Sequence, residues 1–328
     1  MANMDRLLEF TLSGGTLRRL EKERMAPGFL AQRLQPASKP RVVIVKEANV
    51  GFSPRAQRQP NVAWWHHSLC DGLLTVKDVK ELVYVGENPK TGENIFAAMA
   101  DTLSGPRLSQ LVWAPSKDGY TFEMSRPEQA AYGLALSLVR WHACSRYCAN
   151  CGAATDLTRD VGFSRLCPTC KRQHFPQLMP AVLVAVMDGR GNVILSQRRK
   201  SSRLLTLLSG FVLHGESAEE TVRREVEEET DARVSEVRYI GSQPWPYPYL
   251  VMLCYYAVAN ASPNLVVEAS ELEKVMWVSK QDVRRALEGQ HSNIELHVPG
   301  TTPYAMLKRW VDGVVDDRGR FTEPPGKL

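Results

Sequence analysis

Residues Gly210 to Asp231 read GFVLHGESAEETVRREVEEETD. Residues 217–230 predict a helix with a dense acidic face. Glu225, Glu228 and Glu229 follow i, i+3, i+4 spacing, so their carboxylates project from one face of that helix. Three like charges so close together repel, and a divalent cation would remove that penalty; such oxygen ligands suit Mg²⁺ or Mn²⁺, which bind through substrate phosphates. The stretch therefore predicts a metal site for a phosphate-containing substrate, with a solvated acidic helix face as the alternative.

The flanking sequence, residues 179–313, predicts a domain of mixed strands and helices. Two apolar runs are separated by residues 188–192, which read DGRGN and are typical of a hairpin turn. The expected strands are residues 181–187, 193–197, 204–212 and 251–259, and the expected C-terminal helices are residues 282–287 and 304–312. Residues 314–328 are polar and contain Pro324-Pro325-Gly326, which predicts a flexible tail.

Residues 144–178 carry four cysteines in two C-x-x-C pairs, which predict a zinc ribbon. Each pair turns tightly enough to aim both sulfurs at one point, and four thiolates form a closed tetrahedral site that leaves no position for substrate. We therefore expect one structural zinc ion per chain; free buried thiols and a redox role are the alternatives. The expected ligands are Cys148, Cys151, Cys167 and Cys170, while Cys70, Cys144 and Cys254 lie outside the pattern.

The first 143 residues read as a β-rich domain that ends in a helix, and no catalytic motif is visible in them. Residues 41–45, 81–85 and 110–114 are rich in β-branched and aromatic side chains, as strands are. Residues 127–143 have a helical pattern, with Pro127 and Glu128 suited to the first turn.

Length and composition set broad limits on the whole chain. The 328 residues suit two or three domains, and 44% hydrophobic with 23% charged residues is ordinary for a globular protein. No apolar run is long enough for a transmembrane helix, so no membrane partner is expected. The first residues lack the apolar core of a secretory signal, and an odd cysteine count fits a reducing compartment. A net charge of +5 does not by itself indicate nucleic-acid binding.

The acidic stretch also resembles the Nudix signature G-x5-E-x7-R-E-U-x-E-E-x-G-U, where U is a bulky aliphatic residue. Asp231 replaces the last glycine and Ala232 the last aliphatic residue. We expect Asp231 to take the left-handed helix cap that the glycine would supply, at a small loss of stability. The positions in register are Gly210, Glu216, Arg224, Glu225, Val226, Glu228 and Glu229.

Residues 242–248, SQPWPYP, resemble the S-Q-P-W-P-F-P-x-S segment of the NADH pyrophosphatase family of Nudix hydrolases, which also has a four-cysteine ribbon before its Nudix domain. The resemblance covers roughly residues 141–310. It implies an α/β fold, namely a Nudix α/β/α sandwich with a mixed sheet, preceded by the zinc ribbon and the β-rich domain. Three positions depart: Leu213 stands where the family commonly has Glu, Tyr247 replaces Phe, and Leu250 replaces the final Ser.

The resemblance implies hydrolysis of the pyrophosphate of NADH or NAD⁺ to nicotinamide mononucleotide and AMP, and it permits removal of NAD caps from RNA. Arg224 is expected to hold the carboxylates by charge-assisted bonds, and Glu228 to act as a metal ligand or as the general base. Glu271 is expected to assist the metal, its alternative being an ordinary exposed carboxylate. The implied catalytic residues are Glu216, Arg224, Glu225, Glu228, Glu229 and Glu271, and the implied Mg²⁺ or Mn²⁺ ligands are Gly210, Glu225, Glu228, Glu229 and Glu271.

The resemblance also implies how the dinucleotide is bound. Phe211 would stack on the nicotinamide, and Phe175 of the partner subunit would complete the site in a homodimer. Gln243, Trp245, Pro246 and Tyr247 would confer dinucleotide preference; for Trp245 a packed structural turn is the alternative.

A nucleotide-sensing module that has lost catalysis is the competing function, with Leu213 and Leu250 as its signs. The cytosol is the expected location. The peroxisome is the alternative, because Gly326-Lys327-Leu328 resembles a Ser-Lys-Leu address without its hydroxyl residue.

Overall fold

The computed structural model describes residues 10–52, 67–69, 72, 74–77, 79–116, 124–158, 161–199, 204–260 and 265–322. Cys70 and residues 323–328 of the expected tail lie outside the described residues. The chain divides into two compact units. Unit 1 comprises Met1–Thr11, Met179–Pro244 and Leu250–Leu328, and unit 2 comprises Leu12–Leu178 and Trp245–Tyr249. Among the described helices, none combines the length and apolar character needed to cross a membrane.

Unit 1 is built on a mixed sheet. Its central strand β12 (Met179–Met187) pairs in parallel with β17 (Leu250–Ala259) and antiparallel with β13 (Asn192–Arg198) and β15 (Leu208–Phe211). The path is β16-β17-β12-β13-β18, where β16 is Val234–Trp245 and β18 is Leu272–Ser279. A short parallel pair joins β14 (Leu204–Leu205) to β19 (Glu295–Leu296). The mixed sheet expected for a Nudix fold is therefore confirmed.

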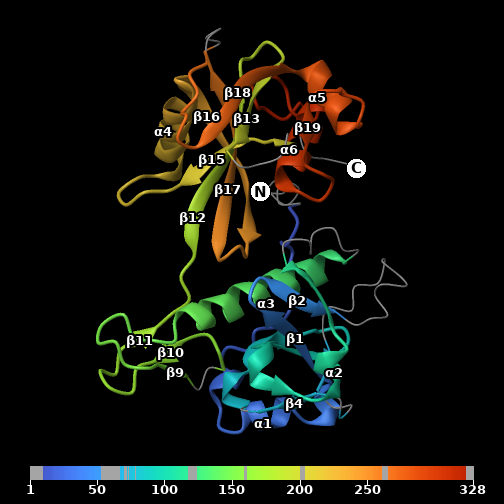
Figure 1. Cartoon of the computed structure of the whole chain (residues 1–328), viewed down its shortest axis with the longest axis vertical. Helices are drawn as coiled ribbons and strands as arrows, with labels where there is room; N and C mark the ends of the chain where they lie inside the picture. Colours follow the sequence, from blue (N-terminus) through green and yellow to red (C-terminus); the bar gives the residue numbers. More distant parts are fainter. Residues whose placement is uncertain are drawn as a thin grey trace. The chain divides into compact units, whose positions relative to one another are not determined.

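Helices cover both faces of this sheet, because β12 is apolar on both sides. Val182, Val184 and Val186 pack in one core with Val222 and Val226 of α4 (Ala218–Thr230). The alternate residues of β12, namely Leu183, Ala185 and Met187, pack in a second core with α5 (Lys280–Leu287) and α6 (Thr302–Val311). Figure 1 shows α4 and the α5–α6 pair on opposite sides of the sheet. Unit 1 is thus the expected α/β/α sandwich.

The segment after α6 is packed as far as the structure describes it. Val315 is fully buried and Phe321 packs against the same core. Asp317 accepts a hydrogen bond from the Trp310 indole at 2.9 Å and pairs with Lys280 at 3.2 Å. Residues 314–322 therefore belong to the folded unit and not to a flexible tail, because two apolar side chains pack in its core and Asp317 bonds to Trp310 and Lys280.

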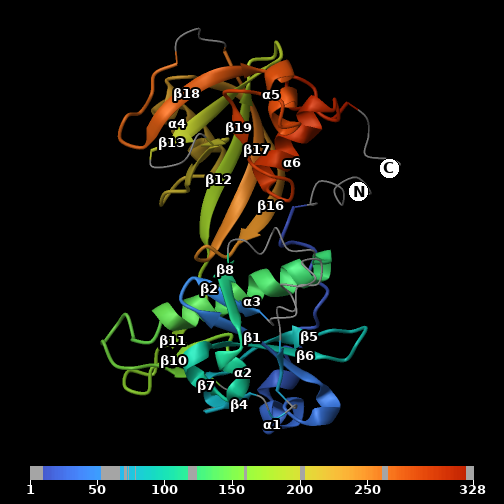
Figure 2. The same ribbon diagram turned by 45° about the vertical axis from the view of Figure 1, so that its right-hand side comes forward.

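Unit 2 contains the expected β-rich domain, which Figure 2 shows from a second side. The sheet order is β5-β6-β1-β2-β8, with β3 (His67–Ser68) on β1. The path strands are β1 (Pro40–Lys46), β2 (Asn49–Phe52), β5 (Val83–Glu87), β6 (Asn94–Met99) and β8 (Val112–Pro115). The smaller elements are η1 (Glu23–Met25), α1 (Phe29–Arg33), η2 (Pro36–Ser38), β4 (Thr75–Val76), η4 (Val79–Glu81), η5 (Ala100–Thr102), β7 (Leu103–Ser104) and α2 (Pro106–Ser109).

The long helix of unit 2, α3 (Arg126–Cys144), lies on one face of that sheet. Its start is fixed by a capping box between Ser125 and Glu128. Tyr132 and Leu136 share a core with Val43 and Val45 of β1. The helix expected at residues 127–143 is therefore present with nearly the same bounds.

The cysteine segment follows α3 and forms a small three-stranded sheet, β9 (Asp156–Leu157), β10 (Arg165–Leu166) and β11 (Gln173–His174). Arg165 is buried and donates to the side chain and carbonyl of Thr155. His142 of α3 bonds the carbonyl of Gly162 at 2.7 Å. These contacts attach the ribbon to the end of α3.

Candidate active site

The acidic helix α4 is fixed at both ends. Ser217 accepts a hydrogen bond from the Glu220 backbone, and the Glu220 carboxylate accepts from Ser217 in return. At the other end Asp231 takes a left-handed conformation, with φ of 58°, and its N–H donates to the Glu227 carbonyl at 2.8 Å. Asp231 thus serves as the helix cap that the sequence predicts.

Arg224 connects three carboxylates of the box. Its Nε donates to Glu216 Oε1 at 2.6 Å and its Nη2 to Glu216 Oε2 at 3.0 Å, a bidentate pair. Its Nη1 donates to Glu225 at 2.8 Å and to Glu228 at 2.9 Å. Arg224 therefore orients the acidic cluster, as expected of this position.

The Glu216 carboxylate is engaged by hydrogen bonds from other residues of unit 1. Besides Arg224, its Oε2 accepts from the Thr221 hydroxyl at 2.8 Å and from the Leu213 N–H at 3.2 Å. These bonds, that from Arg224 first, lower the pKa of Glu216 to about 2. The carboxylate is therefore a permanent anion that holds Arg224 in place.

Glu225 lies against the backbone of Gly210 in strand β15. A Cβ built at Gly210 would fall 1.9 Å from the Glu225 carboxyl carbon and 2.1 Å from both its oxygens. Only glycine at position 210 leaves room for the carboxylate there. The first glycine and the first helical glutamate of the box thus form one site.

Glu229 is the most deeply buried carboxylate of the cluster, at 3% exposed. Among the described residues its Oε2 has no hydrogen-bond partner. Burial, and then the nearby charges of Glu225 and Glu271, raise its pKa to about 8 against a counteracting Arg198. A buried acceptor without a donor is costly unless a cation or a proton meets it.

The residues fit a divalent cation. Burial also raises the pKa of Glu225, so two neighbouring carboxylates are held in a place that disfavours their charge. The negative charge of Glu271 acts on both of them, which puts it near the cluster as expected. Carboxylate oxygens, one of which has no donor among the described residues, are the hard ligands that Mg²⁺ or Mn²⁺ prefers.

Arg198, at the end of β13, is a residue that the sequence analysis missed. Its Nη2 donates to the hydroxyl and carbonyl of Ser209 at 2.8 and 3.1 Å. Its charge partly offsets the burial of Glu229. Arg198 and the acidic helix become neighbours only when the strands pair. The residue type of Arg198 therefore could not indicate that it belongs to the site.

The residues expected to bind the dinucleotide lie in different environments. Phe211 and Phe175 are 52% and 60% exposed, as ring-stacking residues would be. Gln243 is buried, donates to the Thr11 carbonyl at 3.1 Å and accepts from Thr302. The polar groups of Gln243 are therefore engaged within unit 1, and its role toward a substrate stays a prediction.

The structure also shows where two residues that depart from the family pattern lie. Leu213 is 54% exposed at the start of the box, so the missing carboxylate would have faced solvent. Leu250 is 9% exposed and starts β17, paired with Met179. Trp245 and Tyr247 stack edge to face at 5.0 Å in the segment that unit 2 contains.

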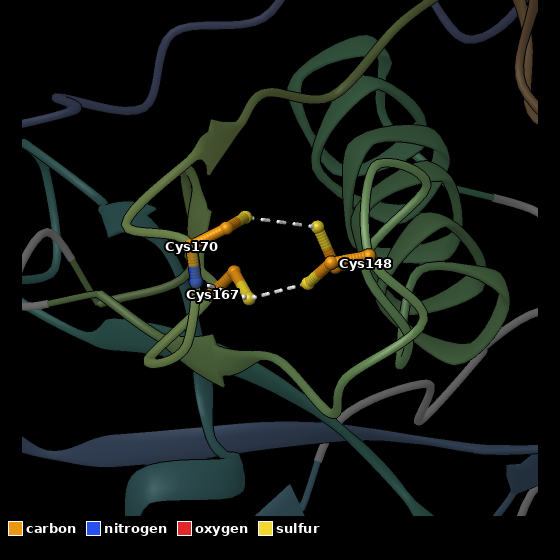
Figure 3. Close-up of side chains that lie close together, drawn as sticks. Cys148, Cys167 and Cys170 are labelled. Atoms are coloured by element: carbon orange, nitrogen blue, oxygen red, sulfur yellow. Dashed lines mark hydrogen bonds between the residues drawn. The ribbon is translucent and has the colours of Figure 1, made fainter.

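The four ribbon cysteines converge as the sequence predicts. All their sulfurs lie within 4.8 Å of one another, with 3.6 Å between Cys148 and Cys170 and 3.5 Å between Cys151 and Cys167. Figure 3 shows Cys148 of the first knuckle facing Cys167 and Cys170 of the second. A tetrahedron of Zn–S bonds near 2.3 Å has sulfurs about 3.8 Å apart, so the cluster fits a zinc-sized ion. The Arg172 N–H lowers the pKa of Cys170 to about 6, which favours the thiolate.

Comparisons with known proteins agree with this geometry. Residues 177–297 match the model of the NUDIX domain family, so the chain contains a Nudix domain. The chain is 34% identical over 183 residues to the NAD-capped RNA hydrolase NudC of Mycobacterium bovis, a match that covers 54% of this chain and 58% of that protein. It is 29% identical over 257 residues to the human NAD-capped RNA hydrolase NUDT12, covering 73% of this chain and 55% of that protein.

A third relative is the mitochondrial NAD(P)H pyrophosphatase NUDT13 of the mouse, 31% identical over 203 residues and covering 58% of this chain and 57% of that protein. The chain thus spans somewhat more than half the length of these curated relatives. The resemblance to Nudix proteins of the NADH pyrophosphatase family, inferred from the box, the ribbon and residues 242–248, is confirmed.

Proposed function

We propose that this chain is a metal-dependent hydrolase that cleaves the pyrophosphate of NADH or NAD⁺ to nicotinamide mononucleotide and AMP, and that it also removes NAD caps from RNA. The observation that carries the proposal is the pair Glu225 and Glu229: the Glu225 carboxylate lies against Gly210, and the buried Glu229 carboxylate has an oxygen without a hydrogen-bond partner among the described residues. The names of the relatives in M. bovis and human support the RNA activity.

In the proposed reaction, water adds to one phosphorus and the bridging P–O bond breaks, so each product keeps one phosphate. Bound Mg²⁺ or Mn²⁺ would neutralise phosphate charge and lower the pKa of a bound water. Glu225, Glu229 and the Gly210 carbonyl are the proposed ligands, with Glu271 assisting. Glu228 is 58% exposed and held by Arg224, which suits it to receive a proton from water or to complete the ligand set.

The cysteine cluster is proposed to hold one structural zinc ion per chain. The sulfur spacing supports it, because a closed four-thiolate site serves the fold and not the reaction. Metal release under a thiol-reactive reagent, counted with a chromogenic chelator, should give one zinc ion per chain. The Nudix cation should remain exchangeable in the same sample.

A homodimer is proposed as the active form. Unit 2 exposes several large apolar side chains on and beside the ribbon, which is unusual unless another surface covers them. They are Tyr147, Leu166, Phe175 and Leu178. Light scattering at micromolar concentration should give twice the chain mass, and Phe175→Asp should give the single mass.

The test of the proposed function is release of AMP from NADH, NAD-capped RNA and ADP-ribose in Mg²⁺ or Mn²⁺. Glu228→Gln should lower kcat by about two orders of magnitude or more while the fold survives, since it removes one proton acceptor or ligand. Glu227→Gln is the matched control, because Glu227 is exposed and pairs only loosely, at 3.5 Å, with Arg233. Tight binding of these ligands without products would instead favour the nucleotide sensor.

A further inference from the structure

The segment Trp245–Tyr249, which forms most of the expected dinucleotide-selecting stretch, belongs to unit 2 and not to the Nudix sandwich. The chain leaves unit 1 after Pro244 and returns at Leu250. Whatever fixes the conformation of this segment must therefore be sought among residues of unit 2.

Arg140 of helix α3 holds the segment by its backbone. Its Nη1 donates to the Pro246 carbonyl, and its guanidinium lies 5.3 Å from the centre of the Tyr247 ring. Its Nη2 donates to the Ser116 hydroxyl at 2.5 Å. The Arg140 side chain thus links the Pro246 carbonyl and the Tyr247 ring to Ser116.

Ser116 is 2% exposed. Its N–H and hydroxyl both donate to the Ala48 carbonyl, at 2.8 and 2.7 Å, in the connection between β1 and β2. Its own carbonyl accepts the hydroxyls of Tyr247 and Tyr132, each at 2.8 Å. We call Arg140 and Ser116 the loop anchor.

Tyr247 stands where the family segment has Phe. Here the hydroxyl adds a hydrogen bond to the loop anchor that a Phe could not make. Pro246 is buried and Arg140 is half-buried, so the hydrogen bond from Arg140 satisfies a backbone carbonyl of a residue that is shielded from water.

We propose that Arg140 is a positioning residue for the hydrolase: through the Pro246 carbonyl and the Tyr247 ring it fixes Trp245–Tyr249 in the conformation that selects the dinucleotide. This inference rests on the proposed function and assigns a role to the N-terminal β-rich domain, which carries no catalytic motif of its own. Arg140 touches no reacting atom; it acts by removing conformational freedom before the substrate binds.

The variants are Arg140→Ala and Tyr247→Phe. Loss of charge-assisted bonds should raise the KM for NADH about tenfold in Arg140→Ala, and loss of one neutral bond should raise it about threefold in Tyr247→Phe. In both variants kcat should stay within about twofold. Amide hydrogen exchange of residues 242–249 should become faster, with residues 217–230 unchanged.

Two matched controls accompany them. Tyr132→Phe removes the other hydroxyl on the same carbonyl without touching the segment, and Arg41→Ala removes a half-buried arginine that pairs with Glu93 at 3.0 Å. Both should leave the KM for NADH and the exchange of residues 242–249 unchanged.

An unchanged KM and unchanged exchange in Arg140→Ala would overturn the inference, as would an equal rise of KM in Tyr132→Phe and Tyr247→Phe. If the unaltered protein does not hydrolyse NADH, the proposed function fails. The exchange of residues 242–249 in Arg140→Ala then decides by itself whether the loop anchor holds the segment.

Discussion

Replacing Glu229 by glutamine should stabilise the protein in the absence of Mg²⁺ and Mn²⁺, and the gain should depend on pH. Glu229 is 3% exposed, its Oε2 has no donor among the described residues, and its pKa is raised from 4.5 to about 8. The unfolded chain therefore releases this proton at lower pH than the folded chain. Because the folded state binds more protons between these two pKa values, stability falls as pH rises from about 4.5 to about 8.

The size of the effect follows from the two pKa values. At about 1.4 kcal/mol for each pKa unit, the ionised carboxylate costs about 1 kcal/mol at pH 5 and about 4 kcal/mol at pH 8. A buried glutamine amide retains a cost of about 1 kcal/mol at every pH. Glu229→Gln should thus be nearly neutral at pH 5 and stabilising by about 3 kcal/mol at pH 8.

The assay is urea unfolding followed by circular dichroism at pH 5, 6, 7 and 8, without added Mg²⁺ or Mn²⁺. The matched control is Glu227→Gln on the exposed side of the same helix, which should leave the pH dependence unchanged. Glu225 also has a raised pKa, so part of the slope should persist in the variant. Identical slopes in Glu229→Gln and in the unaltered protein would refute the reasoning.

Three further outcomes are expected. Gly210→Ala places a methyl group on the Glu225 carboxylate, so it should weaken Mn²⁺ binding, measured by calorimetry, at least tenfold while the circular dichroism spectrum stays unchanged. Unaltered Mn²⁺ affinity would contradict the inference that Gly210 and Glu225 form one metal site. Cys167→Ser should lose the bound zinc and make residues 144–178 sensitive to protease, and retention of one zinc per chain would argue against the assigned ligands. Asp231→Gly should stabilise the protein by about 0.5–1 kcal/mol in urea unfolding, because glycine adopts the left-handed cap without strain, and a destabilised variant would show that the Asp231 side chain matters.

The fold of unit 1 was largely predictable because its signals are local. The hairpin at residues 188–192 joins β12 and β13, and the acidic helix starts and ends within a residue of its expected bounds. Ser217 and Glu220 form the S-x-x-E capping box that fixes the helix start, which is a further local signal in the sequence. Strand β6 of unit 2 was missed because NIFAAM has no strict alternation and two alanines, which are poor strand formers.

The acidic cluster could be predicted as a set of residues but not as an electrostatic environment. Spacing placed three carboxylates on one helical face, yet it gave no sign that Glu229 is buried while Glu228 stays exposed. That difference depends on the strands that pack against α4. The loop anchor is still less accessible from sequence, since Arg140 and Pro246 are 106 positions apart and each is an ordinary residue of its own segment.

The guanidinium of Arg224 has a consequence for how the site fills. In the protein alone it acts as a resident counterion for Glu225 and Glu228, while Glu216 keeps it tethered. A divalent cation bound by Glu225 and Glu228 would take the place of this internal positive charge, so filling the proposed site would be an exchange of cations and not a simple addition. The pair with Glu216 would keep the arginine beside the carboxylates, where it could bind the anionic oxygens of a diphosphate.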